Sequence, residues 1–236
     1  MTATSDQRSR RQRNPRGQGE RLRDDIIEAA SRLLEDPAAP PLSLRSVARA
    51  VGVAATSVYL HFDDSDSLVR AVAARHFGEL VRSQDEACKD LTDTCARVQA
   101  SALAYCQFGL AHPGHYQVMF SNPLPLPPPG PAGVREPGPG RPALDRMVEV
   151  VAACLGGRPG DSASMQTTLL IWQQLHGMVS LRICRPLYSW PPLADTVTDA
   201  VGRLLDGARG EWQDPDSSPP VILASGERTV QDTAQP

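Results

Sequence analysis

The sequence contains no run of about 18 apolar residues, so it offers no segment for crossing a membrane. Its first residues, MTATSDQRSRRQRNPRGQGERLR, lack the apolar core of a secretory signal. Strand signals are scarce, because aromatic residues make up only 5% of the chain and no stretch alternates cleanly between apolar and polar side chains. We therefore expect an all-α protein in the cytoplasm, with no membrane partner.

Recognisable catalytic patterns are missing as well. There is no HExxH spacing, no nucleophile elbow and no phosphate-binding glycine loop. His112, His115 and His176, together with nearby carboxylates, leave a metal or acid–base site open as an alternative. We expect a protein that is not an enzyme and that holds no metal and no cofactor.

The five cysteines lack the CxxC spacing of a zinc or redox site. The positions of Cys88, Cys95 and Cys106 are compatible with one face of a helix. We expect all five, Cys154 and Cys184 included, to be reduced and to pack as small apolar side chains. A thiol sensor is the alternative.

A net charge of −3 by itself argues against a nucleic-acid partner, but the distribution of charge reverses that argument. Residues 1–23 carry seven arginines against Asp6 and Glu20, a net charge of +5, which leaves −8 on the rest of the chain. A basic arm on an acidic body is expected when one end of a protein meets phosphate. A solvated tail without a partner is the alternative.

The order of the chain predicts a small domain followed by a larger one. Residues 1–19 read as a disordered basic arm, 20–66 as a DNA-binding domain and 67–212 as a helical ligand-binding and dimerisation domain. Within the larger domain, 122–142 are rich in proline and glycine and predict a long loop. Residues 213–236 read as a disordered tail. Helices are expected over roughly 66–90, 91–111, 114–121, 142–156, 161–185 and 193–211.

The stretch SLRSVARAVGVAATSVYLHF, residues 43–62, carries the functional signal. Ser43 is a good N-cap for a short helix, and Ala48 is small where two helices must cross closely. Gly52 follows the last turn, where a left-handed backbone conformation is needed. The next helix begins at Ala54 or Ala55 and sends Val58 inward. Together these features predict a helix-turn-helix and therefore a duplex DNA partner.

The segment VARAVGVAATSVYLHFDDSDSLVRAV resembles the DNA-binding domain of the tetracycline-repressor (TetR) family, and the residues 59–62 match its Tyr-x-His-Phe signature. In addition, HPGHYQVMF at 112–120 and the Trp172, His176 and Gly177 pattern resemble a subgroup of that family named for its Trp-His-Gly motif. The resemblance implies a ligand-responsive transcriptional regulator.

Several residues of the motif are expected to contact DNA. The N-terminal half of the second helix enters the major groove in such proteins, and the resemblance implies phosphate contacts by the signature residues. The predicted DNA-binding residues are Arg45, Arg49, Ala55, Thr56, Ser57, Tyr59 and His61. Many relatives have a lysine where this chain has Ser65, between acidic residues. We expect Asp64 to cap the next helix and the arginine arm to supply the missing phosphate contacts.

The larger domain is expected to bind a small apolar or aromatic effector and to form a homodimer. The predicted effector-binding residues are Tyr105, Phe108, His112, Met119, Phe120, Trp172 and His176. The resemblance places the dimer contact on 161–185 and 193–211. Their apolar stripes consist of Leu169, Trp172, Leu175, Met178 and Val179 in the first, and Val197, Val201, Leu204 and Leu205 in the second.

The sequence thus predicts a repressor that binds a palindromic operator as a dimer and is released by a small molecule. An activator or a thiol-sensing regulator of the same fold is the alternative. A helical metalloenzyme and an adaptor that uses the proline-rich loop are the interpretations from other classes.

Overall fold

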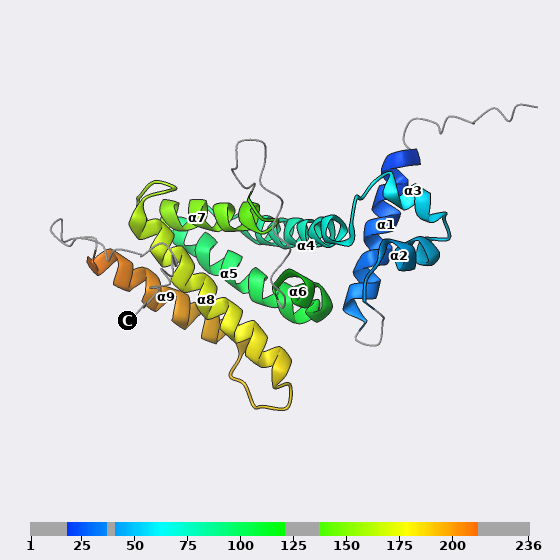
Figure 1. The fold of residues 1–236 in the computed structure, drawn as a ribbon. Coiled ribbons are helices and arrows are strands. Elements are labelled where there is room, and N and C mark those ends of the chain that lie inside the picture. The colour runs from blue at the N-terminus through cyan, green and yellow to red at the C-terminus, as the bar shows by residue number, and fades with distance from the viewer. Residues whose placement is uncertain (1–17, 37–40, 121–136, 212–236) are drawn as a thin grey trace, which may run out of the picture.

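The computed structural model describes residues 18–36, 41–120 and 137–211, and these ranges contain helices and no strand. Most of the predicted arm, loop and tail therefore lies outside the described residues. A small group consists of α1 (Gln18–Glu35), α2 (Leu44–Val51) and α3 (Ala55–Tyr59). The larger group, which lies beside it in Figure 1, consists of α4 (Ser65–Cys88), α5 (Thr94–Ala111), α6 (Pro113–Phe120), α7 (Arg141–Leu155), α8 (Ser162–Cys184) and α9 (Leu193–Glu211). The predicted all-α fold is confirmed. Among the described helices, none is both long enough and apolar enough to cross a membrane.

The small group has the local geometry that the sequence predicts. Ser43 caps α2, since its Oγ accepts a hydrogen bond from the Ser46 backbone N–H at 3.1 Å and the Ser46 hydroxyl in turn accepts one from the Ser43 backbone N–H. Gly52 ends the helix with φ of +79°, in the left-handed region where a side chain would be strained. Ala48 and Val58 are buried in a shared core with α1 and α4.

Helix α4 of the larger group contributes side chains to the cores of both groups. Its N-terminus is capped by Asp64, which accepts a hydrogen bond from the Ser67 backbone N–H at 2.6 Å. Leu68 and Val72 are fully buried in the core of the small group. Further along the helix, Phe77 and Leu80 are buried in the core of the larger group. A shift of α4 would therefore be felt in both cores.

Helix α5 lies at the centre of the larger group, where it packs against α4, α7, α8 and α9. Apart from Leu169, the side chains of the apolar stripes predicted for the dimer helices face this core within a single chain. The stripe residues buried there are Leu175, Met178, Val179, Val197, Val201 and Leu205. Because they are buried within one chain, they are unavailable for a dimer contact. An apolar stripe at helical spacing predicts a buried face, but it does not tell whether the same chain or a second copy covers that face.

The prediction that all cysteines are reduced is wrong for two of them. Cys95 and Cys154 form a disulfide between the start of α5 and the end of α7, with their Cα atoms 4.8 Å apart. The chain turns between α4 and α5, so Cys88 and Cys95 do not share a helix. Cys88 and Cys106 are free and buried, as expected, and Cys184 is free and exposed. The two bonded cysteines are far apart in sequence, and no local pattern signals the pair.

We expect Gly109→Ala to lower the free energy of unfolding by about 1–3 kcal/mol, the usual cost of overpacking a core. A Cβ at Gly109 would lie 2.7 Å from Val179 Cγ1 and 2.8 Å from the Tyr116 ring. Urea unfolding measures the change. Gly78→Ala is the matched control, since a Cβ there meets only Arg82 at 3.6 Å. Equal stability of the two variants would contradict the prediction.

Candidate DNA-binding and ligand-binding sites

Four of the seven side chains predicted to contact DNA are exposed on α2 and α3. Arg45, Arg49 and Thr56 are exposed on the two helices. Tyr59 ends α3 and is half-exposed, and Leu60 beside it is 84% exposed. Burial of these two side chains against a partner surface would be favourable, because it would remove apolar area from water. Sequence reasoning missed Leu60, although it occupies the variable position of the Tyr-x-His-Phe signature.

The other three predicted DNA-binding residues lie partly inside. Ala55 and Ser57 are half-buried on α3, and Ala55 packs against the core of the small group. His61 is half-buried beside the start of α1, where a Cβ on Gly19 would lie 4.0 Å from its Cε1. Phe62, next in the chain, is buried, and the Arg23 guanidinium lies 5.3 Å from the centre of its ring.

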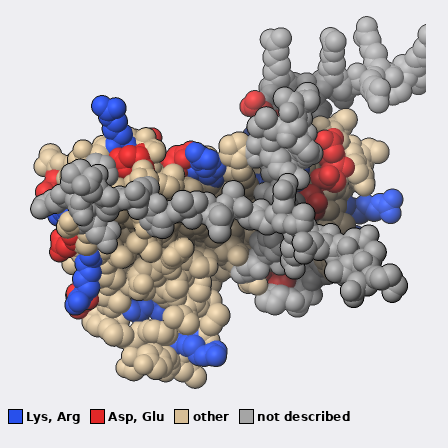
Figure 2. All heavy atoms as spheres, turned by 60° about the vertical axis from the view of Figure 1, so that its left-hand side comes forward, with Lys and Arg blue, Asp and Glu red and all other residues tan. Residues whose placement is uncertain are grey.

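The acidic start of α4 is accounted for by capping. The backbone N–H of Ser67 donates to the Asp64 carboxylate and is the main cause that holds its pKa below the usual range. Asp66 lies in the first helical turn, where the helix dipole favours negative charge. In Figure 2, acidic and basic side chains are interspersed over the visible face. The arginine arm, up to residue 17, lies outside the described residues.

The larger group contains a partly open cavity of about 330 Å³ between α4, α5, α6, α7, α8 and residues 138–140. This volume lies within the range that small-molecule sites occupy. Aromatic and aliphatic side chains dominate the lining, and Gln84, Tyr105 and Arg141 are among its polar members. Four predicted effector residues line it, namely Tyr105, Met119, Phe120 and Trp172. The cavity is suited to a small, largely apolar molecule.

A chain of hydrogen bonds runs from the cavity wall into the core. Trp172 Nε1 donates to Tyr105 Oη at 3.2 Å, and the Tyr105 and Tyr116 hydroxyls are 3.1 Å apart. Tyr116 Oη is 2.6 Å from His176 Nδ1. Burial raises the pKa of Tyr105 and raises that of Tyr116 to about 12, so both hydroxyls keep their protons at neutral pH. Burial lowers the pKa of His176, which leaves its Nδ1 able to accept from Tyr116.

The remaining predicted effector residues are placed elsewhere. Phe108 and His112 line a separate hollow with Glu79 and His115, and His176 lines neither space. The sequence reasoning missed a set of cavity residues on α4 and α7, which includes Phe77, Leu80, Gln84, Leu144 and Met147. The helical periodicity of these residues predicts that they lie on a buried face, but it does not indicate that this face borders a cavity.

We expect the free energy of unfolding to fall as the pH drops from about 7 to 5, in part through His176. Its folded pKa lies below the ordinary value, so the unfolded chain binds the proton more readily and acid favours unfolding. The loss begins below the unfolded pKa of about 6.5 and ends at the folded pKa. Urea unfolding across this range measures it, and His176→Gln should flatten the dependence. Identical pH dependence in the two proteins would contradict this assignment.

Two segments of the chain match models of known protein families. Residues 26–72 match the model described as "Bacterial regulatory proteins, tetR family", and residues 98–206 match the model described as "Tetracyclin repressor-like, C-terminal domain". The chain belongs to the TetR family. It is therefore a DNA-binding transcriptional regulator. Membership in the Trp-His-Gly subgroup stays a prediction.

Relatives match over most of the length of this TetR-family chain. It is similar to the HTH-type transcriptional regulator Rv1816 of Mycobacterium tuberculosis, with 26% identity over 219 residues, 79% of this chain and 91% of the relative. A solved protein of unknown function from Rhodococcus is 28% identical, with a TM-score of 0.62 over 83% of this chain and 98% of its own. A TetR family transcription regulator from Marinobacter aquaeolei shares the fold at 13% identity, with a TM-score of 0.52 over 79% and 95% of the two chains. TetR-family regulators bind DNA operators and small-molecule effectors and typically form dimers.

Proposed function

We propose that this regulator is a repressor, which binds a palindromic operator as a homodimer and leaves it when a small apolar or aromatic molecule enters the cavity. We propose a regulatory role and no catalytic one. The observation that carries the proposal is the continuity of α4. The helix is packed into the helix-turn-helix core at Leu68 and Val72 and forms the cavity wall at Phe77, Leu80 and Gln84.

Helix α6 supplies a second connection between the cavity and the small group. Met119 and Phe120 line the cavity, whereas Val118 packs against the core of the small group. At its other end, Gly114 approaches α1 so closely that a Cβ would lie 2.7 Å from Glu35 Cγ. A ligand that displaces α6 or α4 would therefore reposition α1 to α3, and the coupling would act through packed contacts.

The dimer contact is proposed for the outward faces of α8 and α9. Six of the nine side chains in the stripes predicted for this contact are buried in the core, but Leu170 and Leu181 on α8 are 45% and 53% exposed. In a two-fold dimer, the recognition helices α3 would enter adjacent major grooves about 34 Å apart, which requires an operator with inverted half-sites. The proposed DNA contacts are Arg45, Arg49, Ala55, Thr56, Ser57, Tyr59 and His61.

The test is selection of bound fragments from a random DNA pool by the full chain. We expect an inverted repeat to be enriched, and an operator-driven promoter to be transcribed less in the presence of the protein. Tyr59→Ala should weaken operator binding at least 10-fold, the effect of losing about 1.4 kcal/mol. Tyr188→Ala is the matched control, because Tyr188 is 64% exposed in the connection between α8 and α9. Failure to enrich any sequence, or equal affinity of the two variants, would overturn the proposal.

A further inference from the structure

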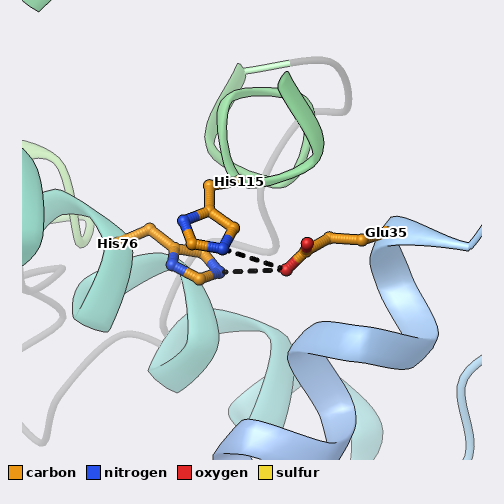
Figure 3. A group of neighbouring side chains, drawn as sticks. All are labelled: Glu35, His76 and His115. Carbon is orange, nitrogen blue, oxygen red and sulfur yellow. Dashed lines mark ion pairs between the residues drawn. The ribbon is translucent and has the colours of Figure 1, made fainter. Parts of the chain in front are cut away.

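Three helices bring potential metal ligands together where the small group meets the larger one. Glu35 comes from α1, His76 from α4 and His115 from α6, and one ligand atom of each lies within 4.8 Å of the others. Glu35 Oε1 is 3.9 Å from His76 Nε2 and 3.4 Å from His115 Nε2. Figure 3 shows both rings presenting this nitrogen to the same carboxylate oxygen. The sequence gives no sign of the group, because its members lie far apart along the chain.

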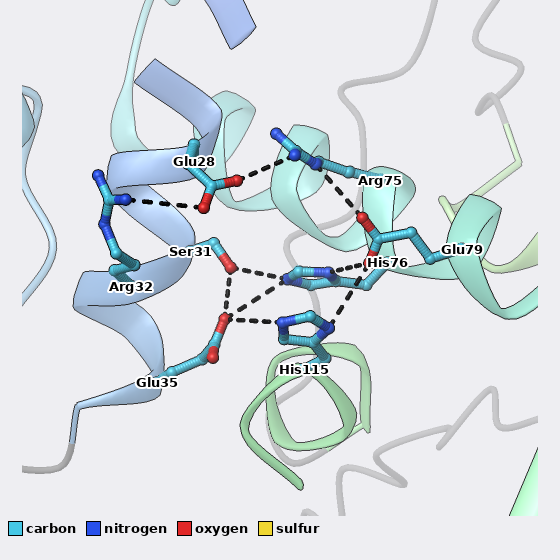
Figure 4. A network of polar contacts seen from close by, with 8 residues as sticks. All are labelled: Glu28, Ser31, Arg32, Glu35, Arg75, His76, Glu79 and His115. Carbon is cyan, nitrogen blue, oxygen red and sulfur yellow. Dashed lines mark hydrogen bonds and ion pairs between the residues drawn. The ribbon is translucent and has the colours of Figure 1, made fainter. Parts of the chain in front are cut away.

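A second carboxylate contacts the His76 ring by a hydrogen bond and lies near the His115 ring, whose Nδ1 is buried without a hydrogen-bond partner. Glu79 Oε2 lies 3.2 Å from His76 Nδ1 and 3.5 Å from His115 Nδ1, on the side away from Glu35 (Figure 4). Glu79 is in turn paired with Arg75 through its other oxygen at 3.4 Å. When Nδ1–H points at Glu79, the Nε2 of each ring has a lone pair directed toward Glu35. This carboxylate–histidine arrangement is the one that holds metal-binding histidines in place.

When both rings are neutral and carry their proton on Nδ1, the side facing Glu35 has more acceptors than protons. Besides Glu35 Oε1 and the two Nε2 atoms, it contains Ser31 Oγ, which is 2.5 Å from Glu35 Oε1 and 3.0 Å from His76 Nε2. The Ser31 hydroxyl has one hydrogen to donate, so the other lone pairs face one another. The His76 side chain is only 2% exposed, and in such a buried place a meeting of lone pairs is unfavourable unless a cation lies between them.

We propose that Glu35, His76 and His115 bind a divalent first-row transition metal ion of the Zn²⁺ class, with water as a further ligand. Two imidazoles and one carboxylate are a donor set that suits zinc, at about 2.0–2.2 Å from each atom. Tetrahedral geometry at those distances separates the ligand atoms by about 3.3 Å. The 3.4 and 3.9 Å from Glu35 to the two nitrogens are close to this separation, and all three ligand atoms lie within 4.8 Å of one another. The ion has access, since the Glu35 and His115 side chains are 27% and 25% exposed.

The site would join the DNA-binding unit to two helices that line the cavity. His76 is adjacent to Phe77 of the cavity wall, and His115 lies one turn before Met119. The bound ion would fix α1 against α4 and α6 at a point outside the cavity. The metal site itself does not depend on whether the protein represses transcription.

The test uses the full chain, dialysed against a chelator and then titrated with Zn²⁺ alone by calorimetry, without DNA. We expect one ion per chain and a rise in melting temperature, because an ion at 100 times its Kd shifts the folding equilibrium by about 100-fold. His115→Ala and Glu35→Gln should each weaken binding at least 10-fold. Co²⁺ should give a visible spectrum without the intense near-ultraviolet band of a cobalt–thiolate bond.

Two controls separate this site from other donors. His112→Ala removes an imidazole that stacks on His115 at 5.0 Å between ring centres but stands outside the group around Glu35, so this variant should bind Zn²⁺ like the wild type. Cys184→Ser removes the exposed thiol and should also leave binding unchanged. Glu35→Gln preserves side-chain shape and keeps the test valid if His115→Ala unfolds. Absence of Zn²⁺ binding to the wild type, or binding that survives both ligand substitutions, would overturn the proposal. Operator binding is measured separately, so failure here leaves the proposed repressor function standing.

Discussion

Reduction of the Cys95–Cys154 disulfide is expected to lower the free energy of unfolding by about 4 kcal/mol, because cross-linking a loop of this length removes a corresponding entropy from the unfolded chain. The closed loop contains α5, α6 and most of α7, and its ends are 59 positions apart. The disulfide is also contacted by α9, because Arg209 Nη2 lies 2.8 Å from Cys95 Sγ. Guanidinium unfolding with and without a phosphine reductant measures the difference.

The double variant Cys95→Ser, Cys154→Ser separates the cross-link from general thiol effects. It should unfold at the same denaturant concentration as the reduced wild type and should no longer respond to reductant. Cys184→Ser is the control, because that thiol is exposed and outside the disulfide, and it should keep the full response. A wild-type midpoint that is unchanged by reduction would show that the bond contributes nothing to stability.

The helix-turn-helix could be predicted in detail because its requirements are local. Ser43 must cap a helix that starts at the next position, Gly52 must adopt a left-handed conformation, and Val58 must face inward from the short α3. Each condition restricts the residue type at a fixed spacing within one short segment. The Asp64 cap was predictable for the same reason, since the carboxylate and the N–H that it accepts from are three positions apart.

The cavity was only partly predictable, because its walls come from several helices. Periodicity identifies a buried face on α4, but it does not distinguish the part that contacts other side chains from the part that borders a void. For that reason Gln84 was missed, whereas Phe108 and His112, which were predicted to bind the effector, line a separate hollow. The disulfide and the Glu35, His76 and His115 group were missed for a related reason, since their members meet only after the helices pack.

Ala143→Trp is expected to abolish the response to an effector while leaving operator binding intact. Ala143 lies in the first turn of α7 and lines the 330 Å³ cavity, so an indole at this position would fill space that a ligand needs. In the wild type, we expect the effector to lower operator affinity by roughly 5- to 150-fold, which is the usual range of allosteric coupling and corresponds to about 1–3 kcal/mol. A fluorescent apolar dye, anilinonaphthalene sulfonate, serves as the first probe of the cavity. Compounds that displace the dye are then tested for release of labelled operator DNA by anisotropy.

Ala163→Trp is the matched control, because Ala163 lines a different cavity of about 270 Å³ near Arg209, and it should keep both dye binding and the operator response. Equal responses of the two tryptophan variants would place the effector outside the cavity of Tyr105 and Trp172. A second measurement tests whether effector and operator binding are coupled. Because linkage is reciprocal, saturating operator DNA must weaken effector binding by the same factor by which the effector weakens operator binding. In the Ala143→Trp variant, the effector should no longer change operator affinity, and operator DNA should no longer change effector affinity. The reason is that the substitution removes the ligand site and leaves the α2–α3 surface unchanged.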